Sequence, residues 1–411
     1  MITSFSTALS ALAADTTAID VIGNNLANLN TPGFKANVVS FHDLVTQSLG
    51  AGLGETQVGF GVGAPVTLRQ FSQGAIQSTG GPLDAAIQGD GFFVVRSNSN
   101  QTLYTRGGNL QVDTAGTLTM PTGEHLQGWT STGGPVNTNV PPGDISVPVG
   151  SLKAPIATTA LSVDLNLNSS AATGDQFSST VQVVDSLGNF HNVTVTFTKQ
   201  AAANTWNYSL AFPNADLTAA GTPTTGTLTF SSSGVLTNPT SASTPPVLNA
   251  NGLTDGAANL ALTWNIFDGQ TPRITQFSQP SASSALAQNG AAAANLVHVG
   301  VGDGGQILAQ YSDGQQVVVG QLAMATVRNP ESLIAVGNST YQLSARSALP
   351  AIGLPGTGGR GAVLGGSVEA STVDIAREFT NLIIFQRGYQ ANTRLITTVD
   401  EISQETINLK R

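Results

Sequence analysis

The chain contains no cysteine, and only 9% of its 411 residues carry a charge. Without cysteine it can form neither a disulfide nor a thiolate-ligated metal site. Its net charge is −9, and its 15 basic residues are scattered, so it lacks the clustered Lys and Arg that nucleic-acid binding requires. Ordinary soluble domains contain about 25% charged residues. Here serine, threonine, asparagine and glutamine take their place, which predicts a neutral polar surface that repels its own copies only weakly.

Long apolar runs are also missing, and the first residues do not have the pattern of a cleaved secretory signal. No continuous run approaches the roughly 18 apolar residues of a membrane span, so we expect no membrane insertion. The first basic residue is Lys35, whereas a cleaved secretory signal starts with a basic region followed by a continuous apolar stretch. If the protein leaves the cell, we therefore expect it to do so without losing a signal peptide.

A seven-residue apolar repeat is present at both ends of the chain, in residues 2–29 and again in residues 368–407. Such a repeat produces a narrow apolar stripe along a helix. We expect the two stripes to form an interface between subunits. Its predicted members are Phe5, Leu9, Leu12, Ile19, Leu26, Ile375, Phe379, Leu382, Tyr389, Ile396 and Val399.

The stripes have a plainer alternative, in which the two helices pack together, or on the rest of the chain, as ordinary core. Ordering about 70 residues costs on the order of 100 kcal/mol, and one narrow shared seam buries too little apolar surface to offset that cost. Ile383 and Ile384 also lie off the main stripe, so apolar surface remains after pairing. Exposed surface of this kind favours burial between subunits.

Local signals predict where the two helices end and begin. Pro32 disfavours helix in the residue before it and Gly33 frees the backbone, so the first helix should stop near Asn30. The sequence Ser371-x-x-Asp374 resembles a capping box with Asp in place of Glu, which predicts the start of the last helix.

The residues between the ends indicate strands and turns. Phe92-Phe93-Val94-Val95 is a short apolar run, and Thr114-Ala115-Gly116 separates two apolar pairs in the manner of a hairpin. Farther along, apolar residues alternate strictly with polar ones, which predicts strands with one buried and one wet face. The alternating residues are Val193, Val195, Phe197, Trp206, Tyr208, Leu210, Phe212, Leu260, Leu262, Trp264 and Ile266.

The pattern therefore predicts a mainly β protein with α-helical termini and nested domains. After residue 285 the composition again resembles that of the first β segment, which indicates that the second β segment is inserted into the first. We expect a helical terminal domain at 1–33 and 367–411, a connecting arm at 34–70 and 356–366, an inner β domain at 71–150 and 286–355, and an inserted outer β-barrel or sandwich domain at 151–285.

No residues stand out as catalytic, cofactor-binding or metal-binding. The four histidines, His42, His125, His191 and His298, are far apart, and none has a second histidine or a carboxylate three or four residues later. We expect each to be a surface or turn residue rather than a ligand. Nucleophile-elbow and Walker-type motifs are absent from the sequence.

Three stretches resemble bacterial flagellar rod and hook proteins. The first is Ile22-Gly-Asn-Asn-Leu-Ala-Asn-Leu-Asn-Thr-Pro-Gly-Phe-Lys35, whose motif residues are Asn24, Asn25, Asn28, Thr31, Pro32, Gly33 and Phe34. The second is Leu83-Asp-Ala-Ala-Ile-Gln-Gly-Asp-Gly-Phe-Phe-Val-Val95 with Tyr104-Thr-Arg106, and the third is Val373-Asp-Ile-Ala-Arg-Glu-Phe379 with Phe385-Gln-Arg-Gly-Tyr-Gln-Ala-Asn392. They occur in the family's order and cover both ends and the inner β domain. Within this family, the length and the inserted segment resemble the hook proteins.

The resemblance implies a helical homopolymer, a curved, flexible tube that joins the flagellar rod to the filament and transmits torque as a universal joint. It implies that the terminal helices line the central channel and that the inserted domain lies outside. Its implied partners are copies of itself, the distal rod protein, the hook cap, the hook–filament junction proteins and the flagellar type III export apparatus. The implied location is extracellular, in the hook and basal body.

Three other readings remain. A distal rod protein looks similar at both ends but is much shorter. A secreted β-rich adhesin would explain the Thr- and Ser-rich strands but not the paired terminal stripes. A carbohydrate-active enzyme would need a converging carboxylate pair and an aromatic platform, and the sequence singles out neither.

Overall fold

The computed structural model describes residues 2–44, 46–49, 56–131 and 135–408. The chain divides into two compact units. The first unit holds residues 1–149, 298–310 and 316–411, and the second holds 150–297 and 311–315. Residues 45 and 50–55 of the predicted arm, 132–134 of the predicted inner β domain, and 1 and 409–411 of the predicted helical domain lie outside the described residues.

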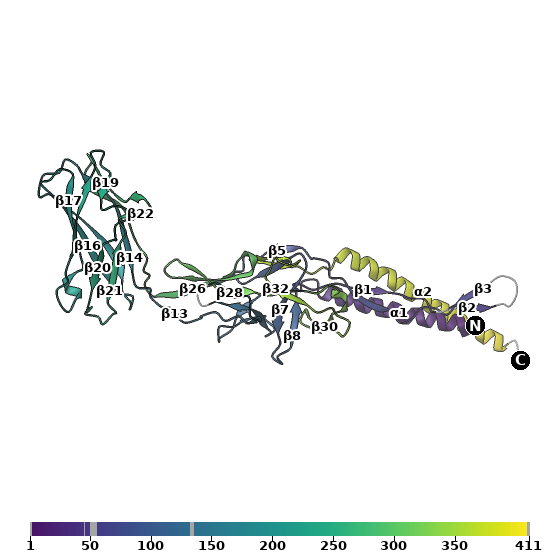
Figure 1. Ribbon diagram of the computed structural model, residues 1–411. Helices are drawn as coiled ribbons and strands as arrows, with labels where there is room; N and C mark the ends of the chain where they lie inside the picture. The colour runs from purple at the N-terminus through teal and green to yellow at the C-terminus, as the bar shows by residue number, and fades with distance from the viewer. Residues whose placement is uncertain (1, 45, 50–55, 132–134, 409–411) are drawn as a thin grey trace. The chain divides into compact units, whose positions relative to one another are not determined.

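Two α-helices and an antiparallel arm form one part of the first unit (Figure 1). Helix α1 spans Ile2–Ala27 and helix α2 spans Ile375–Asn408. In the arm, β1 (Asn37–Ser40) pairs with β4 (Val66–Arg69), and β2 (Thr46–Leu49) pairs with β3 (Thr56–Gly59). The predicted connecting arm at 34–70 is thus a β-ladder that folds back along the helices.

The arm is attached to both helices by specific contacts. Asn25 is buried in α1, donates from Nδ2 to the carbonyl of Asn37 at 2.8 Å, and accepts the Asn37 amide at 2.9 Å. The Phe41 and Phe385 ring centroids are 5.8 Å apart, which joins the arm to α2. The arm therefore packs against both α1, which precedes it directly, and α2, which is more than 300 residues away.

A large antiparallel sheet forms the rest of the first unit, with β7, the predicted run beginning at Phe92, near its centre. Its core contains Phe92, Val94, Tyr104 and Trp129. The predicted hairpin around residues 114–116 is confirmed, since β9 pairs antiparallel with β10. The strands are β7 Phe92–Arg96, β8 Thr102–Thr105, β9 Gln111–Val112, β10 Leu118–Thr119, β11 His125–Thr130, β12 Gly143–Asp144, β27 Gln306–Tyr311, β28 Gln316–Leu322, β29 Met324–Thr326, β30 Ile334–Gly337, β31 Thr340–Gln342 and β32 Ala351–Gly353.

Two short strand pairs correct the predicted limits of the terminal domain and the arm. β34 (Ser367–Glu369) pairs with β5 (Ile76–Ser78), so residues 367–369 are strand, not helix. β33 (Ala362–Gly365) pairs with β6 (Ala85–Gln88), so residues 362–365 of the predicted arm at 356–366 are strand. The backbone groups of these residues bond to neighbouring strands, so the apolar repeat, which begins at residue 368, extends beyond the start of the helix into β34.

The start of α2 also differs from the predicted capping box. Asp374, not Ser371, is the N-cap, and its Oδ1 accepts the amide of Arg377 at 3.1 Å. Ser371 instead accepts the amide of Val373 at 3.3 Å, in the turn that precedes the helix. Asp374 stands immediately before the first helical residue, which is where a short acceptor side chain satisfies a free amide.

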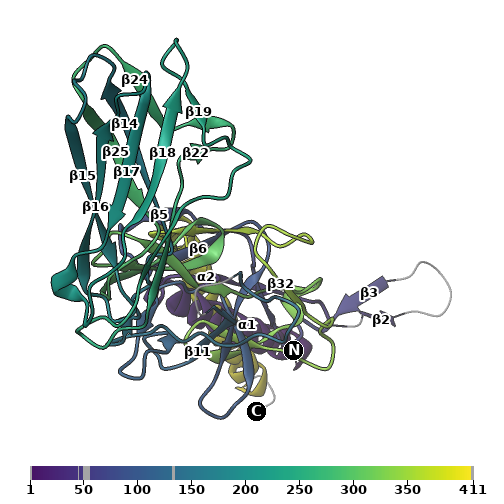
Figure 2. The same cartoon turned by 60° about the vertical axis from the view of Figure 1, so that its left-hand side comes forward.

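The second unit is a β-sandwich whose two main sheets share one core. The predicted alternation is confirmed, because every residue named for it above is buried. One sheet contains β14 Ala160–Asn168, β20 Val247–Ala250, β21 Leu260–Trp264, β24 Ile274–Phe277 and β25 Ala282–Gln288. The other contains, in order, β15 Gln176–Val184, β16 Phe190–Lys199, β17 Thr205–Ala211, β18 Thr224–Phe230 and β19 Leu236–Asn238 (Figure 2).

The limits of this unit differ slightly from the predicted 151–285. Strand β25 pairs with β14 as far as Gln288, so the sandwich continues beyond residue 285. Two further strands, β13 (Leu152–Lys153) and the start of β26 (Ala294–Val301), pair antiparallel where the chain enters and leaves the unit. A small hairpin of β22 (Phe267–Asp268) and β23 (Thr271–Pro272) completes the set.

Candidate functional site

Helix α1 faces the rest of its own unit with small residues. Its buried positions are Ala8, Ala14, Ala18, Ile22 and Asn25. At about 100° per residue, the predicted stripe lies roughly 100° around the helix from this buried face. The first stripe therefore lies to one side of the most buried face of α1.

The exposure of the α1 stripe follows from that geometry. Phe5 is 42% exposed and Leu9 is 54% exposed. Leu12, Ile19 and Leu26 are half-buried. The structure thus places all five predicted residues along one side of α1 and leaves the two nearest the N-terminus open to solvent.

The two helices meet through small and polar groups. Asn392 of α2 donates to Asp15 Oδ2 of α1 at 3.0 Å. A Cβ added at Gly388 would lie 3.3 Å from the same carboxylate, so glycine at this position permits the close approach.

Helix α2 divides the predicted residues of the second stripe between two environments. Leu382, Ile396 and Val399 are half-buried, on the side that also carries Phe385 and Asn392. The other three, Ile375, Phe379 and Tyr389, are exposed, with Phe379 at 51%. The seven-residue spacing therefore does not correspond to one contact face within the monomer.

Additional exposed apolar residues extend along α2 on both sides of its buried face. Ile375, Phe379 and Ile383 are spaced by four and lie on one flank. Ile384, Leu395 and Ile402 are spaced by 11 and 7 and fall within roughly 20° of one another on the opposite flank. We call these two sets the α2 flanks. Sequence reasoning named only part of them, because it followed a single seven-residue period.

The predicted family motif forms the turn by which the chain leaves α1. Asn28 Nδ2 donates to the carbonyl of Asn24 at 2.9 Å, and Thr31 Oγ1 donates to Asn28 Oδ1 at 3.1 Å. The amide of Phe34 then donates to the carbonyl of Thr31 at 3.2 Å, which closes the turn around Pro32. These side chains bond locally, so the motif shapes the backbone where the helix ends.

Gly33 is the most restricted position of that turn. Its φ is +69°, and an added Cβ would lie 2.5 Å from the backbone of Arg106 and Gly107. Its amide donates to the carbonyl of Glu369 at 2.8 Å. Only glycine combines this backbone conformation with so close an approach.

A buried ion cluster lies beside the turn and joins three distant segments. Lys35 Nζ is 2.6 Å from Glu369 Oε1, and Arg106 Nη1 is 3.2 Å from Glu369 Oε2. The side chains of Lys35 and Glu369 are fully buried. Burial lowers the pKa of Lys35, and the Glu369 carboxylate opposes that shift. The cluster connects the end of α1, the large sheet and the strand that precedes α2.

Helix α1 is relevant to the expectation that the chain does not insert into a membrane. Within the described residues, Phe5–Ala27 is one helix that is long and apolar enough, by length and composition alone, to cross a membrane. Asp15 and Asp20 interrupt this segment, so it contains no continuous apolar run. In this structure Asp15 bonds to α2.

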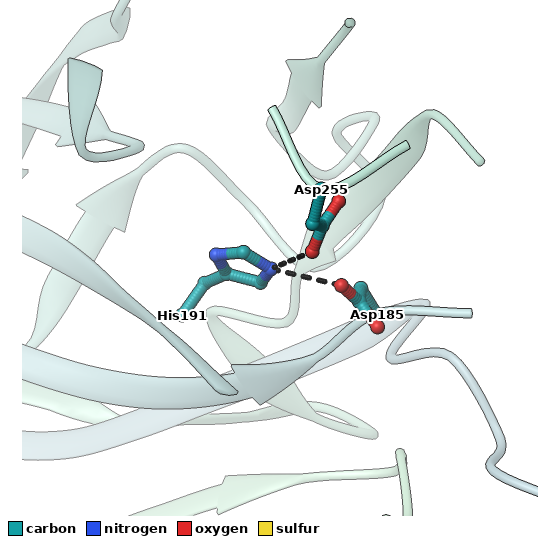
Figure 3. Close-up of side chains that lie close together, drawn as sticks. All are labelled: Asp185, His191 and Asp255. Atoms are coloured by element: carbon teal, nitrogen blue, oxygen red, sulfur yellow. Dashed lines mark hydrogen bonds and ion pairs between the residues drawn. The ribbon is translucent and has the colours of Figure 1, made fainter. Parts of the chain in front are cut away.

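His191 corrects the expectation that the histidines are surface or turn residues. It lies in β16, is buried, and faces Asp185 and Asp255 (Figure 3). Asp216 lies at its other ring nitrogen. Sequence reasoning missed this cluster because it searched for carboxylates three or four residues away. The nearest of the three in sequence is six residues away, and the others come from separate loops.

Comparison with known families finds four matches along the chain. Residues 5–35 match the flagella basal body rod protein family, and 86–165 match the D1 domain of the flagellar hook protein FlgE/F/G. Residues 157–291 match the D2 domain of flagellar basal body protein FlaE, and 364–409 match the C-terminal region of the flagellar basal body rod FlgEFG proteins.

Full-length relatives agree with these matches. The chain is 32% identical to the flagellar hook protein FlgE of Salmonella typhimurium over 99% of this chain and 100% of the relative. It is 33% identical to the FlgE of Treponema pallidum over 96% of each. A crystal structure of Helicobacter pylori flagellar hook protein FlgE2 covers 70% of this chain and 99% of that one, with a TM-score of 0.52 at 13% identity, which shows a shared fold.

Proposed function

This chain belongs to the family of flagellar hook proteins, and from that premise we propose that the apolar sides of its two terminal helices join neighbouring subunits into a tube. The chain is a structural subunit of the bacterial flagellar hook, in the part of the flagellum outside the cell membrane. The proposal concerns how the subunits hold together and assigns the chain no catalytic role.

The observation that carries this proposal is the amount of apolar side chain that the helices leave exposed. Phe5, Leu9, Ile375, Phe379 and Tyr389 were predicted from spacing alone, and each is exposed in the single chain. Fully burying one large apolar side chain contributes about 1.5–3 kcal/mol. Contact between subunits over several half-exposed residues of this kind would favour assembly by several kcal/mol per subunit.

The separation of the α2 flanks supports contact with more than one neighbour. Two apolar surfaces on opposite sides of a helix cannot both face the same partner helix. In a tube each subunit has neighbours on several sides, so the two flanks would each meet a different copy. Leu12, Ile19, Leu26, Leu382, Ile396 and Val399 would complete these contacts from positions that are already half-buried.

The remaining features of the proposal follow from the family. The tube would be curved and flexible and would act as a universal joint that transmits torque from rod to filament. Its end partners would be the distal rod protein, the hook cap and the hook–filament junction proteins. Delivery would be through the flagellar type III export apparatus.

A pair of matched substitutions tests the proposed interface. Phe379→Ser removes a half-exposed apolar side chain from an α2 flank, whereas Phe190→Ser removes one that is 56% exposed on the second unit. We expect Phe379→Ser to raise the protein concentration needed for tube formation by roughly 10-fold or more. Light scattering and negative-stain microscopy measure this, and circular dichroism checks that the monomer remains folded.

Phe190→Ser should assemble at the wild-type concentration. Normal tubes from Phe379→Ser, or from a chain that lacks residues 1–30, would refute the role of the helices. A defect in Phe190→Ser alone would move the interface to the second unit.

A further inference from the structure

Three loops of the second unit bring acidic side chains around one buried histidine. Asp185 follows β15, Asp216 ends the short 3₁₀ helix η1 (Asn214–Asp216), and Asp255 lies in the loop before β21. His191 is in β16, and its side chain is only 7% exposed. Figure 3 shows the imidazole edge directed at the carboxylates of Asp185 and Asp255.

The two ring nitrogens have different surroundings. Nδ1 lies 2.8 Å from Asp216 Oδ2. Nε2 lies 3.1 Å from Asp185 Oδ2 and 3.6 Å from Asp255 Oδ2. A neutral imidazole has one N–H. When that hydrogen is on Nδ1 and donates to Asp216, three acceptor atoms converge at Nε2, and a cation placed among them would contact all three.

The two carboxylates are held in place independently of the histidine. Asp185 Oδ1 accepts the amides of Leu187, Gly188 and Asn189 at 2.7, 2.7 and 2.9 Å, so the carboxylate is fixed and its Oδ2 faces the ring. Asn189 Nδ2 donates to Asp255 Oδ2 at 3.0 Å and to Asp185 Oδ2 at 3.4 Å, which brings the two carboxylates together.

We propose that Asp185 Oδ2, His191 Nε2 and Asp255 Oδ2 form a binding site for a divalent first-row transition metal such as Zn²⁺. These three ligand atoms lie within 4.8 Å of one another. Zinc binds nitrogen and oxygen at about 2.0–2.2 Å, so neighbouring ligands of one ion are roughly 3.0–3.6 Å apart. The two separations measured from Nε2 fall in that range. One imidazole with carboxylates is a ligand set that suits Zn²⁺.

Asp216 provides a second, independent feature of such a site. Metal-binding histidines usually donate their other ring N–H to a carboxylate or carbonyl, which fixes the tautomer and turns the free nitrogen toward the metal. Asp216 occupies that position here. A proton competes for the same place, since burial lowers the pKa of His191 but the carboxylates of Asp216 and Asp185 outweigh it and raise the pKa.

A bound metal would tie strand β16 to the loops that carry Asp185 and Asp255. The turn that carries Asp185 also presents Leu187 and Phe190, which are 57% and 56% exposed. Metal binding would therefore stabilise the second unit and fix the position of an apolar tip on its surface. This inference is independent of how the helices assemble.

The test uses the unassembled full-length chain after removal of metal with EDTA. Titration calorimetry with Zn²⁺ should show one saturable site per chain. The unfolding midpoint of the second unit, followed by the fluorescence of Trp206 and Trp264, should rise by roughly 5–10 °C when Zn²⁺ is a hundredfold above its dissociation constant. X-ray absorption should show only nitrogen and oxygen ligands.

Asp255→Asn and His191→Gln should abolish this site, and His298→Ala, at an exposed histidine, should retain it. Asp255 is exposed, so its variant tests the site even if His191→Gln does not fold. Binding and a midpoint shift in Asp255→Asn equal to those of the wild type would overturn the proposal. An absence of saturable binding in the wild type would also overturn it and leave a proton as the occupant, while the role in the hook would be unaffected.

Discussion

The sandwich of the second unit and the terminal helices of the first treat their large apolar side chains in opposite ways. In the sandwich, Phe197, Trp206 and Trp264 are at most 1% exposed, and one core collects the inner faces of both sheets. In the helices, three of the buried positions of α1 are alanines, while Phe5 and Phe379 remain about half exposed. The sandwich thus contains what it needs to fold alone, whereas the helices keep apolar surface for contacts outside the monomer.

This difference indicates where each region obtains its stability. Stability from a closed core is independent of protein concentration, while stability from intersubunit burial increases with concentration. In the free chain, the second unit should therefore be stable and the terminal helices less stable.

Three substitutions separate these contributions. Tryptophan fluorescence follows the unfolding of the sandwich, and the ellipticity at 222 nm follows the unfolding of the helices. Two of the three tryptophans are in the sandwich, and both described α-helices are in the first unit.

The largest effect is expected from Phe197→Ala in the core of the sandwich. Truncation of a fully buried phenylalanine costs roughly 4 kcal/mol, because it removes buried apolar surface and leaves a cavity. The tryptophan-detected unfolding midpoint should fall by roughly 10 °C, while the ellipticity of the helices should be unchanged. Phe190→Ala, in the same strand but exposed, is the control and should change the free energy of unfolding by about 0.5 kcal/mol or less. Loss of helix signal together with the sandwich would show that the two regions are coupled.

Glu369→Gln should have the next largest effect, and it should destabilise the first unit rather than the sandwich. It removes the charge opposite Lys35 and Arg106 while keeping the shape of the side chain. Leaving a buried charge without its partner costs roughly 3 kcal/mol. Chemical denaturation followed at 222 nm should shift to lower denaturant, with the sandwich transition unchanged. Glu401→Gln, at an exposed position of α2, should have no such effect. An unaltered helix transition would mean that the cluster does not hold the helices to the sheet.

Asp374→Ala should give the smallest of the three effects. Loss of the N-cap of α2 leaves the amide of Arg377 without its side-chain acceptor and costs about 1 kcal/mol. Amide hydrogen exchange should become faster in the first turn of α2. Asp374→Ser should restore most of the protection, because serine is also a good N-cap. Equal exchange in all three proteins would show that the helix start is held by packing alone.

Local regularity explains which parts of this fold could be predicted from sequence. Strict alternation around Val195 and Tyr208 predicted the buried face of the sandwich correctly, because in a strand the period of two maps directly onto burial. The stripes led to the correct two helices but not to their internal contact. The most buried positions of α1 include Ala14 and Ala18, whose low hydrophobicity is inconspicuous beside a repeat of Phe, Leu and Ile.

Contacts between distant segments account for the remainder. Lys35 and Glu369 are 334 positions apart, and no periodicity relates them. Asp255 approaches His191 only because the sandwich brings two loops together. A local signal did exist near the histidine, since Asp185 followed by Gly188-Asn189 is typical of a turn closed by an aspartate side chain. That signal predicts the turn but not the second and third carboxylates.

The paired strands β13 and β26 have a consequence for how proteins of this kind can diversify. Leu152 lies opposite Asn295 and Lys153 opposite Ala294, so the two points where the chain crosses into the sandwich are adjacent. A segment whose ends are adjacent can be lengthened, shortened or replaced as a unit. The rest of the fold still connects to the same two neighbouring chain ends in each case. Genetic replacement of residues 154–293 by a short turn, or by another domain with adjacent termini, should therefore leave the rest of the fold in register.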